Sequence, residues 1–142
     1  MCTRLFVAAL VLAACSPQPS EAPPAAPAVV AEAAPLTVAT IATPAQNARV
    51  TSPLTVSGRA PAGWFFENQF PVQLLDAQGA IIAEAPATPR ISWTEPGDKD
   101  YDATLIFTVT RETPATLVVM QDMPGEGEAP EQTRIEVVLV PS

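Results

Sequence analysis

The side chains that could perform catalytic chemistry in this chain are few. The sequence contains no histidine, which excludes Ser-His-Asp and Cys-His arrangements and removes the commonest zinc ligand. Lys99 is the only lysine, and we expect no apolar surroundings that would favour the neutral amine a nucleophile requires. Nothing in the spacing of the 15 acidic residues pairs two of them for glycoside hydrolysis. We therefore predict no catalytic residues, no cofactor and no enzymatic activity.

Asp98, Asp100 and Asp102 recur at every second position, a spacing that could supply oxygen ligands to calcium. An EF-hand loop would require glycine where Ala103 stands and glutamate where Val109 stands. The pattern therefore indicates solvated carboxylates on the outer face of a strand, and we predict no metal site.

Aromatic residues gather in the run 63–67, Gly-Trp-Phe-Phe-Glu, where we expect the longest strand, 64–75, to begin. Neighbouring side chains of a strand point to opposite faces, so these aromatic residues cannot all belong to the core. In a structural interpretation, Phe66 packs inside while Trp64 and Phe65 cover the end of the fold.

In the same structural interpretation, Glu67 pairs with Arg59 or Arg90. In a functional interpretation, the aromatic row is a stacking platform for a glycan or a peptide, and Glu67 accepts hydrogen bonds from the ligand. Both interpretations stay open from the sequence alone. The candidate binding surface consists of Trp64, Phe65, Glu67 and Trp93.

Residues 1–14 are typical of a short secretory signal, with Arg4 followed by an apolar run that is too short to span a membrane. The tetrapeptide 12–15, Leu-Ala-Ala-Cys, resembles the bacterial lipoprotein signal. This resemblance implies cleavage before Cys15 and a thioether-linked diacylglyceride on it. Two or three acyl chains, at about 0.8 kcal/mol per buried CH2, would hold a soluble domain on a membrane.

Residues 15–35 alternate proline with alanine and predict a disordered, extended tether that follows the lipidated cysteine. Ser16, rather than aspartate, follows Cys15, which favours the outer membrane, facing the periplasm, in a Gram-negative cell. The formal charge of -8 disfavours nucleic acid as a partner. We expect the protein in the bacterial cell envelope.

Residues 36–142 are rich in valine, threonine and isoleucine, are cut by proline and glycine at short intervals, and show no helical periodicity. About seven strands and one long crossing predict an all-β, immunoglobulin-like Greek-key β-sandwich. The expected strands are 36–41, 54–58, 64–75, 80–85, 101–110, 115–120 and 133–140.

A distinctive pattern runs through the segments 52–60, 64–67, 70–74 and 76–79, Trp93 and a strand closing on Phe107. With this pattern, roughly residues 41–140 resemble a known family, the immunoglobulin-like domain of bacterial spore-germination proteins. The resemblance implies the sandwich fold and brings no ligand or catalytic residue with it. Its members often carry a second germination-associated domain, for which this chain has no room, so a germination role is the least favoured.

Two functions remain open. The first is a non-enzymatic binding or accessory module for an envelope protein or a cell-wall polymer such as peptidoglycan. The second is a structural component of a multiprotein envelope assembly that pairs through a sheet edge. Polymer binding predicts an exposed aromatic row at Trp64 and Phe65, whereas assembly predicts an unprotected strand edge or an apolar patch.

Overall fold

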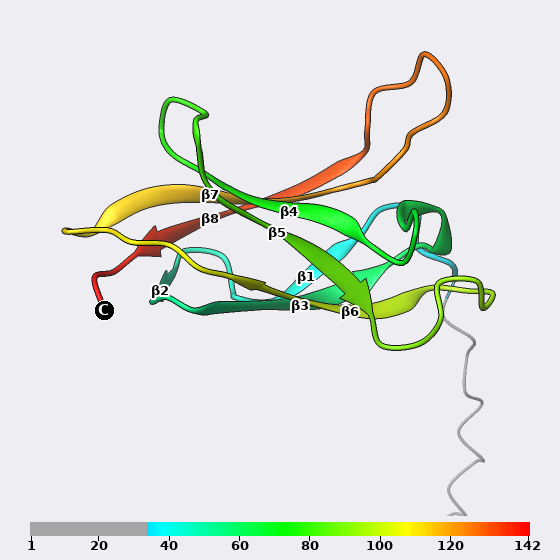
Figure 1. The fold of residues 1–142 in the computed structure, drawn as a ribbon, viewed down its shortest axis with the longest axis horizontal. Helices are drawn as coiled ribbons and strands as arrows, with labels where there is room; N and C mark the ends of the chain where they lie inside the picture. Colours follow the sequence, from blue (N-terminus) through cyan, green and yellow to red (C-terminus); the bar gives the residue numbers. More distant parts are fainter. Residues whose placement is uncertain (1–33) are drawn as a thin grey trace, which may run out of the picture. The chain divides into compact units, whose positions relative to one another are not determined.

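The computed structural model describes residues 34–142; the predicted signal segment, Cys15 and the tether up to residue 33 lie outside the described residues. The described residues form eight strands and one turn of 3-10 helix, without an α-helix, which confirms the all-β prediction (Figure 1). The elements are β1 (Thr40–Thr43), β2 (Ala48–Val50), β3 (Leu54–Ala60), η1 (Ala62–Trp64), β4 (Phe70–Leu75), β5 (Ile81–Pro89), β6 (Lys99–Leu105), β7 (Thr113–Met120) and β8 (Gln132–Leu139).

The strands form one curled sheet in the order β1-β3-β6-β5-β4-β7-β8-β2, which folds into two facing layers (Figure 1). One layer contains β1, β3 and β6, and the other contains β4, β7, β8 and β2. Neighbouring strands are antiparallel except for the parallel pair β2–β8. The first layer follows the A-B-E order of an immunoglobulin domain, and β4, β7 and β8 follow its C-F-G order.

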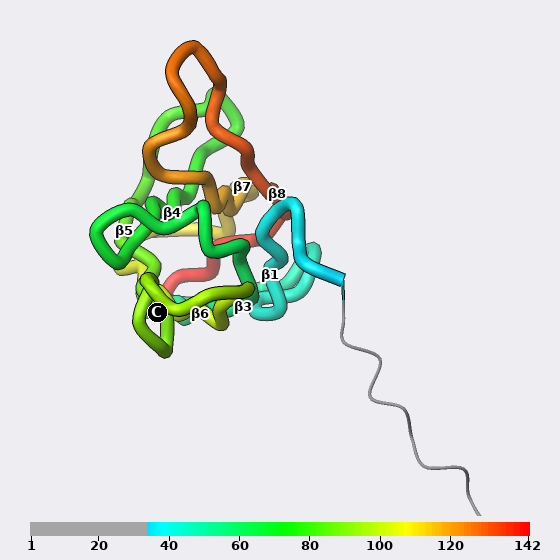
Figure 2. The backbone as a smooth tube through the Cα atoms, turned by 90° about the vertical axis from the view of Figure 1, so that its right-hand side faces the viewer, coloured from blue at the N-terminus to red at the C-terminus, as the bar shows by residue number. Residues whose placement is uncertain are grey.

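Both open sides of the sandwich are bridged by a segment that passes from one layer to the other. On one side, β1 pairs with β3 while β2, only a few residues later, pairs with β8. On the other side, β5 pairs with β4 through Ala87 and then with β6 at Thr88 and Pro89. Seen along the strands, the backbone therefore closes almost into a ring (Figure 2). This closure leaves only short unpaired strand edges.

The core follows the period-two alternation of the strands. Inward positions of β3, β4 and β6 are buried, while the positions between them are wholly or partly exposed. Phe70 lies at the centre, with its ring centroid 5.9 Å from that of Trp64, 5.0 Å from that of Phe65 and 4.9 Å from that of Tyr101. Residues 34–142 contain no cysteine, so no disulfide joins the two layers of the described domain.

Several of the predicted strand boundaries are wrong. The strand expected over 101–110 ends at Leu105, and the strand expected over 80–85 extends to Pro89. The first strand begins at Thr40 rather than at residue 36, and the expected turn over 44–53 contains the additional strand β2. Residues 44–47 do not join β1 and β2 as a hairpin; they carry the chain from the edge of one layer to the edge of the other. The eight observed strands thus correspond to the seven expected ones plus β2.

Candidate functional site

The aromatic run does not begin a long strand. Residues 62–64 form η1, and the chain then reverses at Glu67 and Asn68, which have φ angles of 49° and 70°. The backbone N–H groups and carbonyl groups of Phe66 and Gln69 bond to each other across this turn, at 3.0 and 3.1 Å. Two successive residues with positive φ define a tight hairpin turn, and asparagine tolerates this conformation better than most residues. Only 70–75 of the predicted strand 64–75 is a strand.

This turn determines which aromatic side chains are buried. Trp64 and Phe65 are 1% and 4% exposed and pack edge-on or tilted against Phe70. Phe66 is 39% exposed. The expected exposed row at Trp64 and Phe65 is therefore wrong, as is the expectation that Phe66 packs inside. Trp64 and Phe65 belong to the core, because η1 directs both of them into the end of the sandwich.

The two other members of the predicted surface are exposed. Glu67 lies in the hairpin turn and Trp93, 37% exposed, lies in the loop between β5 and β6. Glu67 does not pair with the arginines expected for it. Arg59 instead lies 3.3 Å from a carboxylate oxygen of Asp100, while Arg90 donates two hydrogen bonds to Asp102.

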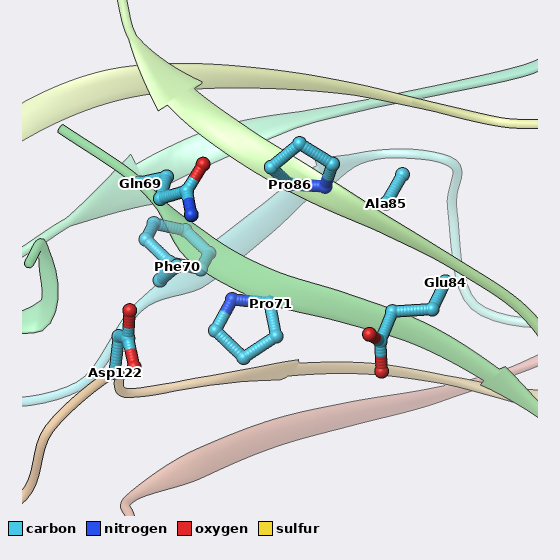
Figure 3. A pocket seen from close by; sticks show the side chains of 7 residues that line it. All are labelled: Gln69, Phe70, Pro71, Glu84, Ala85, Pro86 and Asp122. Carbon is cyan, nitrogen blue, oxygen red and sulfur yellow. The ribbon is translucent and has the colours of Figure 1, made fainter. Parts of the chain in front are cut away.

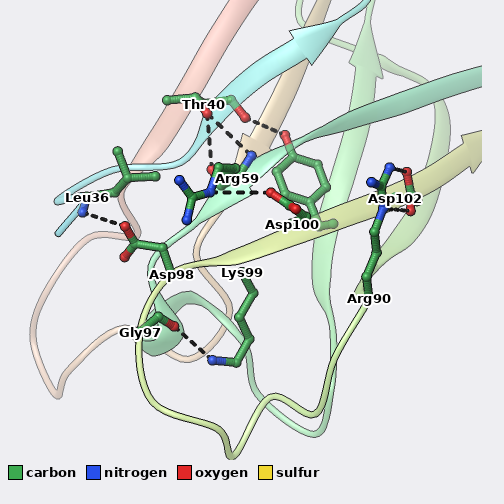
Figure 4. A network of polar contacts seen from close by, with 10 residues as sticks. Leu36, Thr40, Arg59, Arg90, Gly97, Asp98, Lys99, Asp100 and Asp102 are labelled. Atoms are coloured by element: carbon green, nitrogen blue, oxygen red, sulfur yellow. Dashed lines mark hydrogen bonds and ion pairs between the residues drawn. The ribbon is translucent and has the colours of Figure 1, made fainter. Parts of the chain in front are cut away.

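The three alternating aspartates have separate partners rather than a common centre (Figure 4). Asp98 accepts a hydrogen bond from the backbone N–H of Leu36 at 2.9 Å, while Asp100 and Asp102 pair with the two arginines just named. Hydrogen bonds from Arg90 hold the pKa of the Asp102 carboxyl below its ordinary value. Within residues 34–142, no three acidic or cysteine side chains come together in a group that could hold a metal ion.

Lys99 is buried, contrary to the expectation that it lacks apolar surroundings. It is 1% exposed and occupies an inward position of β6, two residues before the buried Tyr101. Its Nζ donates hydrogen bonds to the backbone carbonyls of Glu95 and Gly97, the latter at 2.8 Å (Figure 4). The ammonium group therefore holds the β5–β6 loop against the end of the sandwich, and these carbonyl contacts give it a structural role.

Four segments meet at the end of the sandwich where the described chain begins (Figure 1). We call this end, comprising residues 34–39, 61–69, 90–98 and 121–131, the loop end. Two hydrogen bonds join pairs of these segments: the backbone N–H of Leu36 donates to Asp98, and the backbone N–H of Asp122 donates to the carbonyl of Trp64 at 3.1 Å. A third ties the segment 34–39 to β8, because the hydroxyl of Thr133 donates to the carbonyl of Ala39. The β7–β8 loop is thus bonded to the β3–β4 loop, and the segment that precedes β1 is bonded to the β5–β6 loop, all at the same end of the sandwich.

The loop end is the most apolar exposed part of the described domain. Seven large hydrophobic side chains are exposed in residues 34–142, and five of them lie at this end. The other two, Ile81 and Ile106, lie at the opposite end. Exposed apolar side chains that gather in one place mark interaction surfaces. The five are Val38, Phe66, Ile91, Trp93 and Met123.

The same end is also strongly acidic. Its four segments contain seven acidic residues and a single base, Arg90, which already pairs with Asp102. The rest of the described chain carries six acidic and five basic residues, so its charge is nearly balanced. The seven acids are Glu67, Glu95, Asp98, Asp122, Glu126, Glu128 and Glu131.

A concavity of about 300 Å³ lies on the outer face of β4 and β5, next to the loop end (Figure 3). Pro71 and Pro86 are directly opposed in the β4–β5 pair, and both line it. Asp122 and Glu84 lie on either side of Pro71 (Figure 3). The complete lining is Gln69, Phe70, Pro71, Glu84, Ala85, Pro86 and Asp122.

The fold, with its two layers and its A-B-E and C-F-G strand orders, defines an immunoglobulin-like β-sandwich. Residues 38–128 match the Gmad2 family, described as the immunoglobulin-like domain of bacterial spore germination, and the chain belongs to this family. This finding confirms the resemblance seen in the sequence. Comparison with curated proteins and with solved structures found no match. No helix in residues 34–142 is long and apolar enough to cross a membrane.

Sequence reasoning missed most of the apolar surface. Ile91 and Met123 are isolated apolar residues in loops, and Val38 lies in the segment 36–41 that the sequence predicts as a strand, so nothing in their neighbourhood indicates that they lie at one end. A usable signal lay in the order of the strands. In an immunoglobulin topology the B–C and F–G loops share one end, which here places the loops 61–69 and 121–131 side by side.

Proposed function

We propose that this chain is a lipid-anchored protein of the bacterial cell envelope whose immunoglobulin-like domain binds another envelope protein through its loop end. The observation that carries this proposal is the gathering of five of the seven exposed large hydrophobic side chains of residues 34–142 on the loops of that end. Lipid anchoring rests on the tetrapeptide 12–15 and on the proline-rich segment after it. The domain binds without catalysis.

A protein partner fits better than a cell-wall polymer. A glycan platform requires flat aromatic faces presented together, and the two residues that would have built it, Trp64 and Phe65, are in the core. The exposed side chains that remain are a mixture of aromatic, aliphatic and thioether groups from four segments. Such a mixture around a composite loop surface resembles the apolar centre of a protein–protein interface.

Assembly through a sheet edge has less support. The terminal strands β1 and β2 have only four and three residues. Pro86 lies in the part of β5 that pairs with β4 on one side and with no strand on the other, and it is directly opposite Pro71 of β4. Two prolines can oppose each other only where the ladder needs neither N–H, so the missing N–H of Pro86 faces the free edge. A partner strand would find no donor at that position.

The binding proposal is tested by photo-cross-linking in intact cells. A cross-linking amino acid is placed at Trp93, at the loop end, or at Ile106, which is 77% exposed at the opposite end. We expect one protein adduct of defined mass from position 93, lost when Phe66→Ala and Met123→Ala are combined, and none from position 106. Equal adducts from both positions, or cell-wall material alone, would refute the proposal.

The anchoring proposal is tested separately. Cys15→Ala should move the protein from the detergent phase to the aqueous phase in a detergent partition. A Cys2→Ala variant is the matched control, because Cys2 lies in the segment expected to be removed. Membrane retention of the Cys15→Ala chain would contradict lipidation.

A further inference from the structure

The concavity on β4 and β5 combines an apolar floor with carboxylate groups at its rim. Pro71 and Pro86 are adjacent across the two strands and face outward, because Phe70 and Val72 beside Pro71, and Ala87 beside Pro86, point into the core. Proline rings are rigid and lose no rotamer freedom when a ligand covers them. The floor therefore suits the methylene groups of a long side chain.

The rim carries two carboxylates without a cation. Glu84 accepts a hydrogen bond from the amide of Gln73, and Asp122 lies on the other side of Pro71 (Figure 3). The three ion pairs found within residues 34–142 involve neither of these acids. Gln69 adds a neutral amide at the loop-end side. Apolar floor, acidic rim and amide together fit the guanidinium or ammonium head of arginine or lysine.

The concavity is continuous with the apolar loop end. Gln69, which lines it, is bonded across the hairpin turn to the exposed Phe66, and Asp122 directly precedes the exposed Met123. The four segments of the adjoining loop end contain seven acids and one base. We infer that the occupant is a basic segment of a protein partner, with an arginine or lysine in the concavity and apolar neighbours on Phe66 and Met123.

This inference rests on the proposed protein-binding function and adds the chemistry of the partner. Charge complementarity decides between a protein and a lipid surface. The acidic loop end would be repelled by the anionic headgroups of a bacterial membrane, whereas it would attract a cationic segment and speed its encounter.

The test uses the full chain in detergent and two synthetic peptides. The first peptide has ten residues in which arginine alternates with leucine, and the second replaces each arginine with citrulline, which keeps the shape and removes the charge. Binding is measured by NMR titration. We expect the arginine peptide to bind, with the largest shifts at Gln69, Ala85 and Asp122, and the citrulline peptide to bind at least about tenfold more weakly.

Isosteric variants locate the contact. Asp122→Asn and Glu84→Gln should each weaken binding of the arginine peptide by about three- to tenfold, because each removes a charge-assisted hydrogen bond at a partly exposed site. Glu136→Gln is the matched control: it removes the same charge from an exposed position on β8 that does not line this concavity. It should change the affinity by less than about twofold.

Four outcomes would overturn the inference. They are no binding of the arginine peptide, equal binding of the citrulline peptide, equal weakening by Glu136→Gln, or binding to vesicles of anionic lipid instead of to the peptide. Equal binding of the citrulline peptide would leave the loop end as a protein-binding surface and remove only the cationic partner. A failed cross-link at Trp93 together with specific peptide binding would refute the proposed function and support the concavity as a binding site for a basic side chain.

Discussion

Replacing Gly58 with alanine should destabilise the domain strongly, because this glycine is where three strands come closest. Gly58 of β3 lies opposite Ile41 of β1 and Tyr101 of β6. A Cβ atom at Gly58 would lie 1.9 Å from the backbone oxygen of Thr40 and 2.8 Å from Oη of Tyr101. The Tyr101 hydroxyl donates a hydrogen bond of 2.9 Å to the same Thr40 oxygen. The new methyl group would thus displace β1 and break this bond.

The magnitude follows from three effects. Losing the hydrogen bond costs about 1 kcal/mol, and overpacking against an immovable backbone atom costs about 1–3 kcal/mol. Alanine restricts the unfolded chain more than glycine does, which offsets about 0.5–1 kcal/mol of this loss. We therefore expect the free energy of unfolding to fall by about 2–3 kcal/mol. For a domain of this size, the Tm should fall by roughly 10–20 °C.

The assay is thermal and guanidinium unfolding followed by circular dichroism. Gly63→Ala is the matched control, because a Cβ atom there meets nothing within 4 Å, and its stability should be unchanged or slightly higher. Tyr101→Phe isolates the hydrogen bond and should cost about 1 kcal/mol. Adding Gly58→Ala to Tyr101→Phe should be less than additive. A Gly58→Ala domain as stable as the Gly63→Ala domain would refute this account of the β1–β3 contact.

Three further predictions concern ionisable side chains. Burial raises the pKa of Tyr101, the only tyrosine, so its absorbance should not show ionisation at pH 10 while the domain is folded. The folded state then holds the hydroxyl proton of Tyr101 more tightly than the unfolded state does. The free energy of unfolding should therefore be constant up to about pH 10 and fall at higher pH, and Tyr101→Phe should weaken this pH dependence. Lys99→Met should speed amide hydrogen exchange in residues 92–98 more than in the rest of the domain, because it removes the hydrogen bonds that hold this loop. Exchange rates that change equally throughout the domain would contradict this role of Lys99. Asp102→Asn should alter the Tm little at pH 7, because the ion pair of Asp102 with Arg90 is exposed. The contribution of this pair to stability is present above about pH 4 and is lost as the pH falls and Asp102 is protonated. A large fall of the Tm at pH 7 would refute this prediction.

The fold could be predicted from the sequence because period-two burial is a local signal. The alternation around Tyr101 and the residues that follow it marks β6, whose pattern is clear without any knowledge of its neighbours. The exact course of the chain near residues 40–50 was not predictable in this way. There, the chain changes layer, and a change of pairing partner leaves no periodicity in a segment of three or four residues.

The candidate site was predicted less well, and for a definite reason. The period-two alternation of Phe66, Phe70, Val72 and Leu74 predicts one strand over 64–75. The chain instead reverses at Glu67 and Asn68, which places Trp64 and Phe65 inside and leaves Phe66 outside. Exposure was thus decided by two backbone angles rather than by the aromatic side chains. The burial of Lys99 was equally hidden, because its partners are backbone carbonyls, which every residue carries.

The closed sides of the sandwich limit where such a domain can bind. With each side bridged by a segment that changes layer, a partner finds the two flat faces and the two ends. The ends differ in charge: the loop end carries seven acids against one base, while the remainder of the described chain is nearly balanced. A charge imbalance of this size costs self-repulsion within the domain. Since the fold does not need these loop acids for its core, the cationic partner proposed above would account for both their sign and their position.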